Sequence, residues 1–275
     1  MDGHNQGRGP DRRLRRRRRP RSQVAQMPDF FEWIWELRER LVLSRDKAAP
    51  LIGISASYLT QIETKRYPPE REVVDGLVIG YELNDMQARH LRELWEPPVD
   101  LAPLDELRTR LITSGQLELL NFHQHNGTLA VYIDYTWHVL AANPSAVRAF
   151  PGLNAVGGNI LSWFFTPIAQ EIIVGWEHVA PHIVATAKAV LGRHRNAPRA
   201  QHLLQQLRKS SDVNRLWRDN IDVAYGRPPT ELFHWRDPTT SEPFSLSIQT
   251  SDHFGTQDIF LSCGFRRPYS GPPLQ

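Results

Sequence analysis

The sequence predicts two folded parts, an all-α domain near the N-terminus and an α+β domain after it. Residues 30–95 place apolar side chains at helical spacing, with breaks at glycine and proline. Pro97, Pro98 and Pro103 then indicate a linker. Beyond them, β-rich segments stand before and after a run of helical patterns. A chain of 275 residues has room for two such domains.

Positive charge is concentrated at the start of the chain. Residues 1–26 contain nine arginines and two aspartates, whereas the remainder contains 24 basic and 28 acidic side chains. A block of like charges repels itself and cannot bury a core, so we predict that residues 1–26 are a disordered basic arm. The arm either grips phosphates and the minor groove, or it is a passive tail or an upstream extension before Met27.

The first helix is expected over Phe30–Leu43. Phe30, Ile34, Leu37 and Leu41 lie on one face of it, and charged residues occupy the other face. Helices are also expected over Glu70–Ile79 and from Asn84 onward.

Between these helices, Ser44–Arg66 reads as two short helices joined by a tight turn. Ser44 and Ser55 are N-cap residues, and Gly53 tolerates the positive φ that a sharp turn needs. Pro50 lies inside the first of the two helices, where a missing donor and a ring clash cost roughly 3 kcal/mol. The alternative interpretation is a helical hairpin that binds nothing.

This stretch resembles the helix-turn-helix of the Cro/repressor-like (XRE) family. The resemblance rests on Ala49, on Gly53-Ile54-Ser55, on Tyr58-Leu59 and on Ile62-Glu63. Lys65 stands where the family has a helix-ending glycine. Five helices in residues 27–96 also agree with the size of an XRE domain.

The resemblance implies that the second helix of the motif enters the major groove of double-stranded DNA. Ala56, Ser57 and Gln61 would face base edges, because a glutamine amide can pair with adenine N6 and N7. The residues expected to contact phosphates are Arg45, Ser55, Thr60, Lys65 and Arg66. One motif reads few bases, so we expect a homodimer on a two-fold symmetric operator.

After a linker at residues 97–104, the pattern changes. Helices are expected over Leu104–Phe122, Ser145–Phe150, Ile160–Phe165, Leu203–Leu207 and Val213–Trp217, with the longest over Glu171–Leu191. Strands are expected over Leu129–Ile133, Trp137–Ala141, Leu232–Trp235, Phe244–Ile248 and Ile259–Phe265. This order of strands, helices and strands predicts an α+β domain of PAS-like type over residues 105–268, followed by a tail at 269–275.

Several segments of this second domain resemble the MmyB-like ligand-binding domain, which accompanies an N-terminal helix-turn-helix in many actinobacterial regulators. They are Ala130–Ile133, Val139–Asn143, Gly158–Leu161, Trp176–Ala180, Ser211–Trp217 and His234. Ala142 replaces an aromatic residue of the family, and Gly158 replaces an arginine. The resemblance implies no enzymatic cofactor and a fatty-acid-like or secondary-metabolite effector.

An apolar pocket for such an effector needs aromatic walls and a few polar anchors. The wall residues that we predict are Trp137, Trp163, Phe164, Trp176, Val179, Ala180, Ile183 and Trp217. The predicted anchors are Asn143, His178 and His234. The alternative is that these aromatic residues are simply core.

Other site classes have little support in the sequence. No apolar run reaches the 18 residues of a membrane span, and Cys263 is the single cysteine, so intrachain disulfides and cysteine zinc clusters are excluded. His123-Gln124-His125 offers two metal ligands at most. We therefore predict a cytoplasmic transcriptional regulator. The rival is an enzyme or lipid-binding protein whose helix-turn-helix no longer recognises DNA, because Pro50 and an acidic globular part disfavour binding.

Overall fold

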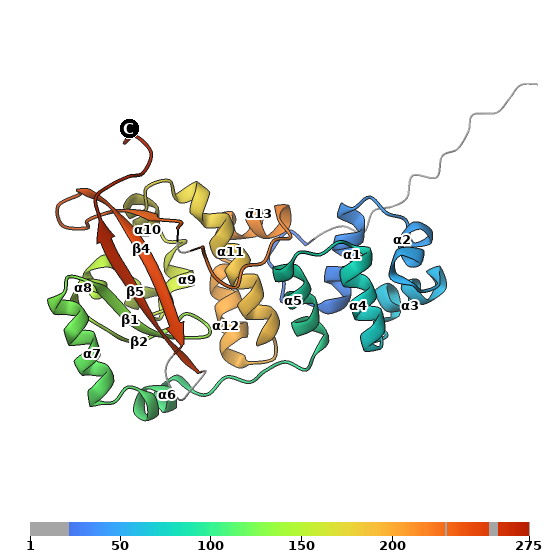
Figure 1. Cartoon of the computed structure of the whole chain (residues 1–275), viewed down its shortest axis with the longest axis horizontal. Helices are drawn as coiled ribbons and strands as arrows, with labels where there is room; N and C mark the ends of the chain where they lie inside the picture. Colours follow the sequence, from blue (N-terminus) through green and yellow to red (C-terminus); the bar gives the residue numbers. More distant parts are fainter. Residues whose placement is uncertain (1–21, 229, 253–257, 275) are drawn as a thin grey trace, which may run out of the picture.

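A computed structural model of the chain describes residues 22–228, 230–252 and 258–274 (Figure 1). The N-terminal part is helical, as predicted. Its helices are α1 (Phe30–Arg40), α2 (Arg45–Ile52), α3 (Ala56–Lys65), α4 (Arg71–Gly80) and α5 (Asp85–Trp95). They enclose one apolar core, in which Ile34, Leu59, Ile62, Leu77 and Leu91 are fully buried.

The C-terminal part is an α+β domain, which confirms the predicted fold class. Its strands are β1 (Leu129–Asp134), β2 (Val139–Ala142), β3 (Phe233–Arg236), β4 (Pro243–Asp252) and β5 (Ile259–Arg267). They form an antiparallel sheet in the order β2-β1-β5-β4-β3. The first and last strands of the domain therefore meet at the centre of the sheet, where β1 pairs with β5.

Helices cover both faces of the sheet. A smaller core lies between one face and the helices α6 (Leu104–Leu111) and α7 (Ser114–His125). The larger core lies on the other face, under the helices that connect β2 to β3. These are α8 (Pro144–Ala149), a 3-10 turn (Leu153–Val156), α9 (Ile160–Trp163), α10 (Pro167–Ile172), α11 (Trp176–Arg193), α12 (Pro198–Leu207) and α13 (Ser211–Asp219).

Two of the predicted helices are each interrupted. The expected helix Leu104–Phe122 is two helices, α6 and α7, because Thr113 starts a new helix: its backbone N–H donates to the Gln116 side chain at 3.1 Å. The expected helix Glu171–Leu191 is broken before Trp176. Gly175 has a φ of 71°, and the Val174 N–H donates to the His234 carbonyl on β3 instead of continuing a helix.

The first helix is also shorter than predicted. It ends at Arg40, and Val42 takes a left-handed φ of 56° so that the Leu43 N–H can donate to the Arg38 carbonyl. Pro50, by contrast, interrupts nothing: α2 runs through it to Ile52 and ends at Gly53 with a φ of 82°.

The boundary of the predicted N-terminal arm is wrong. Residues 1–21 lie outside the described part of the chain, but Ala25 is fully buried in the larger core. Its N–H donates to Asn214 Oδ1 at 2.9 Å, and its carbonyl accepts from Arg208. Residues 22–27 therefore belong to the folded C-terminal domain, although they precede the helical one in sequence.

The two domains contact each other through α5 and α11 (Figure 1). Gly192 of α11 lies directly against His90 of α5, since a Cβ on Gly192 would be 2.6 Å from His90 Cε1. Beside them, the buried Glu93 carboxylate pairs with Arg193 at 3.1 Å and accepts from the Tyr225 hydroxyl at 2.6 Å. This contact joins the helical domain to the end of the longest helix of the α+β domain.

Candidate DNA-binding surface and ligand-binding domain

Helices α2 and α3 form the turn that the sequence predicted. The Ser44 and Ser55 hydroxyls accept from the Lys47 and Tyr58 N–H groups at 3.3 and 3.1 Å, so each starts its helix. Leu59 and Ile62 face the core, which directs the opposite side of α3 outward. Helix α3 ends at Arg66, which lies in the left-handed region with a φ of 53°. The helix-ending glycine of the XRE family would stand one residue earlier, at Lys65.

The outward side of α3 presents a polar stripe. Ser57, Gln61 and Lys65 are exposed, and Ala56 and Thr60 are half-buried. The Thr60 hydroxyl donates to the Ala56 carbonyl at 2.8 Å, which bonds it to the backbone of α3 itself. Thr64, which the sequence analysis missed, is also exposed; its place three residues after Gln61 could have revealed it.

A buried ion cluster holds α1, α2 and α3 together. Glu63 accepts from Arg38 twice, at 2.6 and 2.9 Å, and from Arg45 at 2.7 Å. The side chains of Glu63 and Arg38 are 0% and 3% exposed, whereas that of Arg45 is 34% exposed. The Arg45 side chain is thus partly buried by its bond to Glu63. Arg66 is more exposed, and its guanidinium pairs with Asp29 at 3.1 Å.

The predicted pocket residues fall into two groups. Six of them lie in the larger core and are buried, namely Trp163, Phe164, Trp176, Val179, Ala180 and Ile183. Trp163 and Trp235 stack with ring centroids 5.6 Å apart, and the Trp176 indole donates to the Phe164 carbonyl at 2.7 Å. These side chains pack against one another in the larger core as an aromatic cluster, and their role as pocket walls stays a prediction.

Of the other predicted pocket residues, Trp137 and Trp217 pack partly buried against the edge of the larger core, and Asn143, His178 and His234 are not part of it. The Asn143 side chain caps α8, accepts from the Ala130 N–H and donates to the Thr128 carbonyl. Its amide is therefore bonded to backbone groups. His178 is exposed, and His234 faces Ser245 and Tyr269 on the opposite side of β3 from Trp235. Trp217 covers the Lys188 ammonium near the other end of α11. Trp137 is half-buried at the β1–β2 turn, with a φ of 64°.

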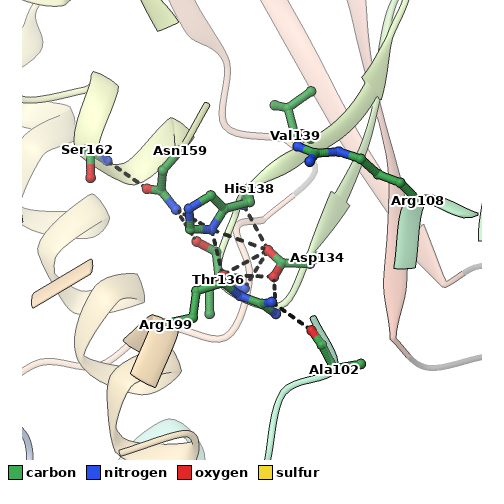
Figure 2. Close-up of polar contacts among 9 residues, drawn as sticks. All are labelled: Ala102, Arg108, Asp134, Thr136, His138, Val139, Asn159, Ser162 and Arg199. Atoms are coloured by element: carbon green, nitrogen blue, oxygen red, sulfur yellow. Dashed lines mark hydrogen bonds and ion pairs between the residues drawn. The ribbon is translucent and has the colours of Figure 1, made fainter. Parts of the chain in front are cut away.

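A polar network that the sequence did not reveal lies at that turn (Figure 2). The buried Asp134 carboxylate accepts from the N–H groups of Thr136 and His138 at 3.0 and 2.8 Å, and pairs with Arg199 of α12 at 2.8 Å. Burial lowers the pKa of His138, against the opposing effect of Asp134. Arg199 also donates to the Ala102 carbonyl at 2.7 Å, which ties the linker to this network.

Buried titratable groups also line the contact between the domains. Burial lowers the pKa of His90 to about 3, with the positive charges of Lys188 and Arg195 acting in the same direction. Burial likewise lowers the pKa of Lys188 to about 8. The Lys188 ammonium donates to the carbonyls of Trp217 and Asn220. The contact between α5 and the α+β domain therefore contains buried polar side chains, His90 and Lys188 among them.

The histidines proposed as a metal fragment have other contacts. His123 Nε2 lies 3.6 Å from the buried Cys263 Sγ, and His125 Nδ1 lies 2.7 Å from the Asn121 carbonyl. Burial raises the pKa of the Cys263 thiol. In the described residues, no helix is both long and apolar enough to cross a membrane.

Comparison with known families identifies both domains. Residues 117–258 match the MmyB-like transcription regulator ligand binding domain. The chain belongs to this MmyB-like family. Residues 35–91 match a helix-turn-helix domain, which covers α2, α3 and α4 completely. A search of curated proteins finds no match.

This MmyB-like protein is therefore a DNA-binding transcriptional regulator with a C-terminal ligand-binding domain. The first match is to a domain of transcription regulators, and the second is to a helix-turn-helix domain. The matched ligand-binding region contains β1 to β4, the aromatic cluster and the Asp134 network.

Proposed function

We propose that this regulator binds DNA sequence-specifically through α3 and that a small lipophilic molecule, bound in its PAS-like C-terminal domain in the cytoplasm, alters that binding. The observation that carries the proposal is the polar stripe on α3, whose exposed members are Ser57, Gln61, Thr64 and Lys65. It is exposed on a helix whose opposite side is fully buried, as a helix in a major groove must be.

Within the stripe, Gln61 is the base reader, because its side chain is central, long enough and able to donate and accept at once. Ala56 and Ser57, nearer the start of α3, face the neighbouring bases. Ser55, Thr60, Lys65, Arg66 and the exposed part of Arg45 contact phosphates and fix the register. Glu63 supports this by holding Arg45 at the edge of the stripe.

Replacing Gln61 by alanine should weaken binding to specific DNA by about 1–3 kcal/mol and leave binding to random DNA almost unchanged. The measurement is a titration of labelled DNA from the upstream region of its own gene, at two salt concentrations. Gln201→Ala, an exposed glutamine on α12, is the matched control and should bind as the wild type does. Equal losses on specific and random DNA would remove Gln61 as a base reader.

We propose further that two copies bind a two-fold symmetric operator, because one α3 reads too few base pairs for a specific site. An exposed apolar pair on one side of α7, Leu119 and Phe122, supports pairing of the C-terminal domains. Phe122 is the more exposed of the two, at 62%.

Phe122→Glu should therefore halve the mass measured by light scattering and lower DNA affinity at least about tenfold, since each half-site would be bound alone. Glu118→Gln on the same helix is the control and should leave the dimer intact. A wild-type protein that is monomeric at assay concentrations would contradict the proposal.

The proposed lipophilic effector binds between α11 and the aromatic cluster. The wide apolar face of α11 supports this, because Trp176, Val179, Ala180 and Ile183 all face the cluster rings. Phe165 packs edge-on against Trp176 at 5.8 Å and is only half-buried, so it marks the border of the cluster. Opening at this border would admit an acyl chain without disturbing the sheet.

Laurate should quench tryptophan emission and raise the melting temperature saturably, because a ligand at a hundred times its Kd stabilises the folded state by about 2.7 kcal/mol. Ala180→Phe should remove both effects, with the milder Ala180→Val as a second variant. If neither response occurs in the wild type, and Ala180→Phe only destabilises the protein by about 1–3 kcal/mol, the cluster is core and holds no effector.

A further inference from the structure

The segment at the end of α13 touches both domains. Helix α13 packs against α11 on the side of the α+β domain that faces the helical domain (Figure 1). Residues 217–225, which we call the clasp, are the last turn of α13 and the chain after it. The Lys188 ammonium of α11 donates to the Trp217 carbonyl at 3.1 Å. The Ala224 N–H donates to the Ala185 carbonyl at 3.2 Å, so both ends of the clasp are bonded to α11.

The clasp holds the end of α1 by charged hydrogen bonds. The Arg40 guanidinium donates to the carbonyls of Arg218 and Asp219, at 3.1 and 3.2 Å. The last carbonyls of a helix have no partner within it and carry partial negative charge, which favours a cation there. Because Lys188 bonds the same end of α13, that helix end binds one cation from each domain.

The clasp holds α5 through Tyr225. The Tyr225 hydroxyl donates to Glu93 Oε2 at 2.6 Å, and the Arg89 guanidinium lies 3.8 Å from the centre of the tyrosine ring. Earlier in the clasp, Ile221 packs partly buried against the core of the helical domain. One segment of the α+β domain therefore contacts the end of α1, the helical core and α5.

The contact between the domains is rich in charged groups, and each domain has a core of its own. The buried apolar side chains of the two domains form separate clusters. At the contact, Arg40, Arg89 and Glu93 are charged, and Gly192 of α11 brings no side chain. Polar contacts between domains of one chain resemble transient interfaces, for which relative movement is the default expectation. The clasp can therefore open while both domains stay folded.

An open clasp does not free the helical domain, because the chain is anchored on both sides of it. Before α1, the Ala25 N–H donates to Asn214 Oδ1 at 2.9 Å. After α5, the Val99 N–H donates to the Arg193 carbonyl at 3.0 Å. Only a few residues separate each anchor from the nearest helix, and three residues span at most about 10 Å. Opening therefore changes the orientation of the helical domain and keeps it beside the α+β domain.

We propose that the clasp is a latch that sets the orientation of α3 relative to the ligand-binding domain. When closed, it fixes one orientation; when open, it permits the others that the two anchors allow. Ser57, Gln61 and Lys65 of α3 are exposed in the closed state, so the latch controls the direction of α3 rather than its access to DNA. This consequence rests on the proposed function, in which two copies bind one operator.

The latch is also connected to the proposed effector site. Val213 of α13 is 1% exposed and belongs to the larger core, which contains the aromatic cluster. Trp217 packs partly buried against the same core. A ligand in that core that moves α13 also moves the carbonyls that hold Arg40.

The test is pulsed electron paramagnetic resonance on the full chain with one spin label on each domain. Lys47→Cys on α2 and Gln201→Cys on α12 are exposed attachment sites, and the buried Cys263 stays in place. The labelled protein should give one narrow distribution of distances. Arg40→Gln together with Tyr225→Phe should broaden that distribution or add a second distance, with unchanged helix content by circular dichroism.

Arg92→Gln is the matched control, because it removes a pair with Asp75 inside the helical domain and should leave the distribution narrow. If the double variant loses helix content, Arg40→Gln alone decides, since it changes only the last residue of α1. A distribution that is already broad without these changes overturns the proposal. Latch variants with a distribution as narrow as that of the parent overturn it equally.

DNA binding gives a second measurement. The wild type should bind its preferred half-site spacing at least about tenfold more tightly than spacings altered by a few base pairs, and the latch variants should lose this preference. If the wild type binds no DNA, the proposed function fails, and the distances alone decide whether the latch exists. If it binds DNA and the latch variants keep its spacing preference, the clasp does not orient α3.

Discussion

Glu63→Ala should destabilise the helix-turn-helix domain by about 3–5 kcal/mol and abolish DNA binding under ordinary conditions. Glu63 is the single acceptor for a bidentate bond from Arg38, whose side chain is 3% exposed, and it also holds Arg45. Without Glu63, the buried Arg38 guanidinium keeps Glu39 as its carboxylate partner, and Glu39 is half-exposed. Urea unfolding followed by circular dichroism measures the loss.

Two controls separate the charge effect from simple packing. Glu39→Ala removes the more exposed partner of Arg38 and should cost about 1 kcal/mol or less. The double variant Arg38→Met, Glu63→Leu removes both buried charges and should recover most of the stability, because an apolar pair needs no counter-charge. A loss of under about 1 kcal/mol for Glu63→Ala would show that the ion cluster does not hold the three helices together.

The helix-turn-helix was predictable because its signals are local. Ser44, Gly53 and Ser55 act on backbone atoms within three residues, and the structure places them at the N-cap, the turn and the second N-cap. Pro50 was expected to disturb α2, yet the helix continues through it. Its ring lies on the exposed side near the end of α2, where no buried side chain has to adjust.

The interruption between α6 and α7 was missed although the spacing pointed to it. Leu107 and Leu111 share one side of a helix, but Leu120 would lie on the opposite side if that helix continued, and Thr113 with Gln116 begins a second helix. This capping signal was visible in the sequence. The break before Trp176 depends on Val174 bonding β3, some sixty residues later, and Gly175 was its one local sign.

The same distinction applies to the candidate functional residues. The stripe on α3 follows from helical periodicity, so Ser57, Gln61 and Lys65 could be chosen from the sequence. The surroundings of the predicted anchors could not be foreseen, because Asn143 bonds Thr128 and His234 bonds Ser245 only through the fold. Asp134 and Arg199 are 65 positions apart and meet only when α12 packs beside the β1–β2 turn.

Asp134→Ala should therefore have the largest effect on the ligand-binding domain, about 3–5 kcal/mol. The carboxylate is 1% exposed and accepts from two backbone N–H groups, from the Thr136 hydroxyl and from Arg199. Alanine leaves the Arg199 guanidinium, 15% exposed, without its counter-charge and frees the turn that positions Trp137. Asp134→Asn should cost less, because an amide oxygen still accepts from the Thr136 and His138 N–H groups.

The linker gives this prediction a second measurement. Arg199 donates to both Asp134 and the Ala102 carbonyl, so an arginine released from Asp134 no longer fixes residues 99–102. Limited proteolysis should then cut the linker faster in Asp134→Ala than in the wild type, under conditions where both remain folded. Asp75→Ala, which removes an exposed ion pair with Arg92, is the control and should change neither stability nor cleavage. If Asp134→Ala unfolds at the same urea concentration as the wild type, the Asp134–Arg199 pair does not stabilise the domain. If its linker resists proteolysis as well as the wild-type linker does, the pair does not restrain the linker.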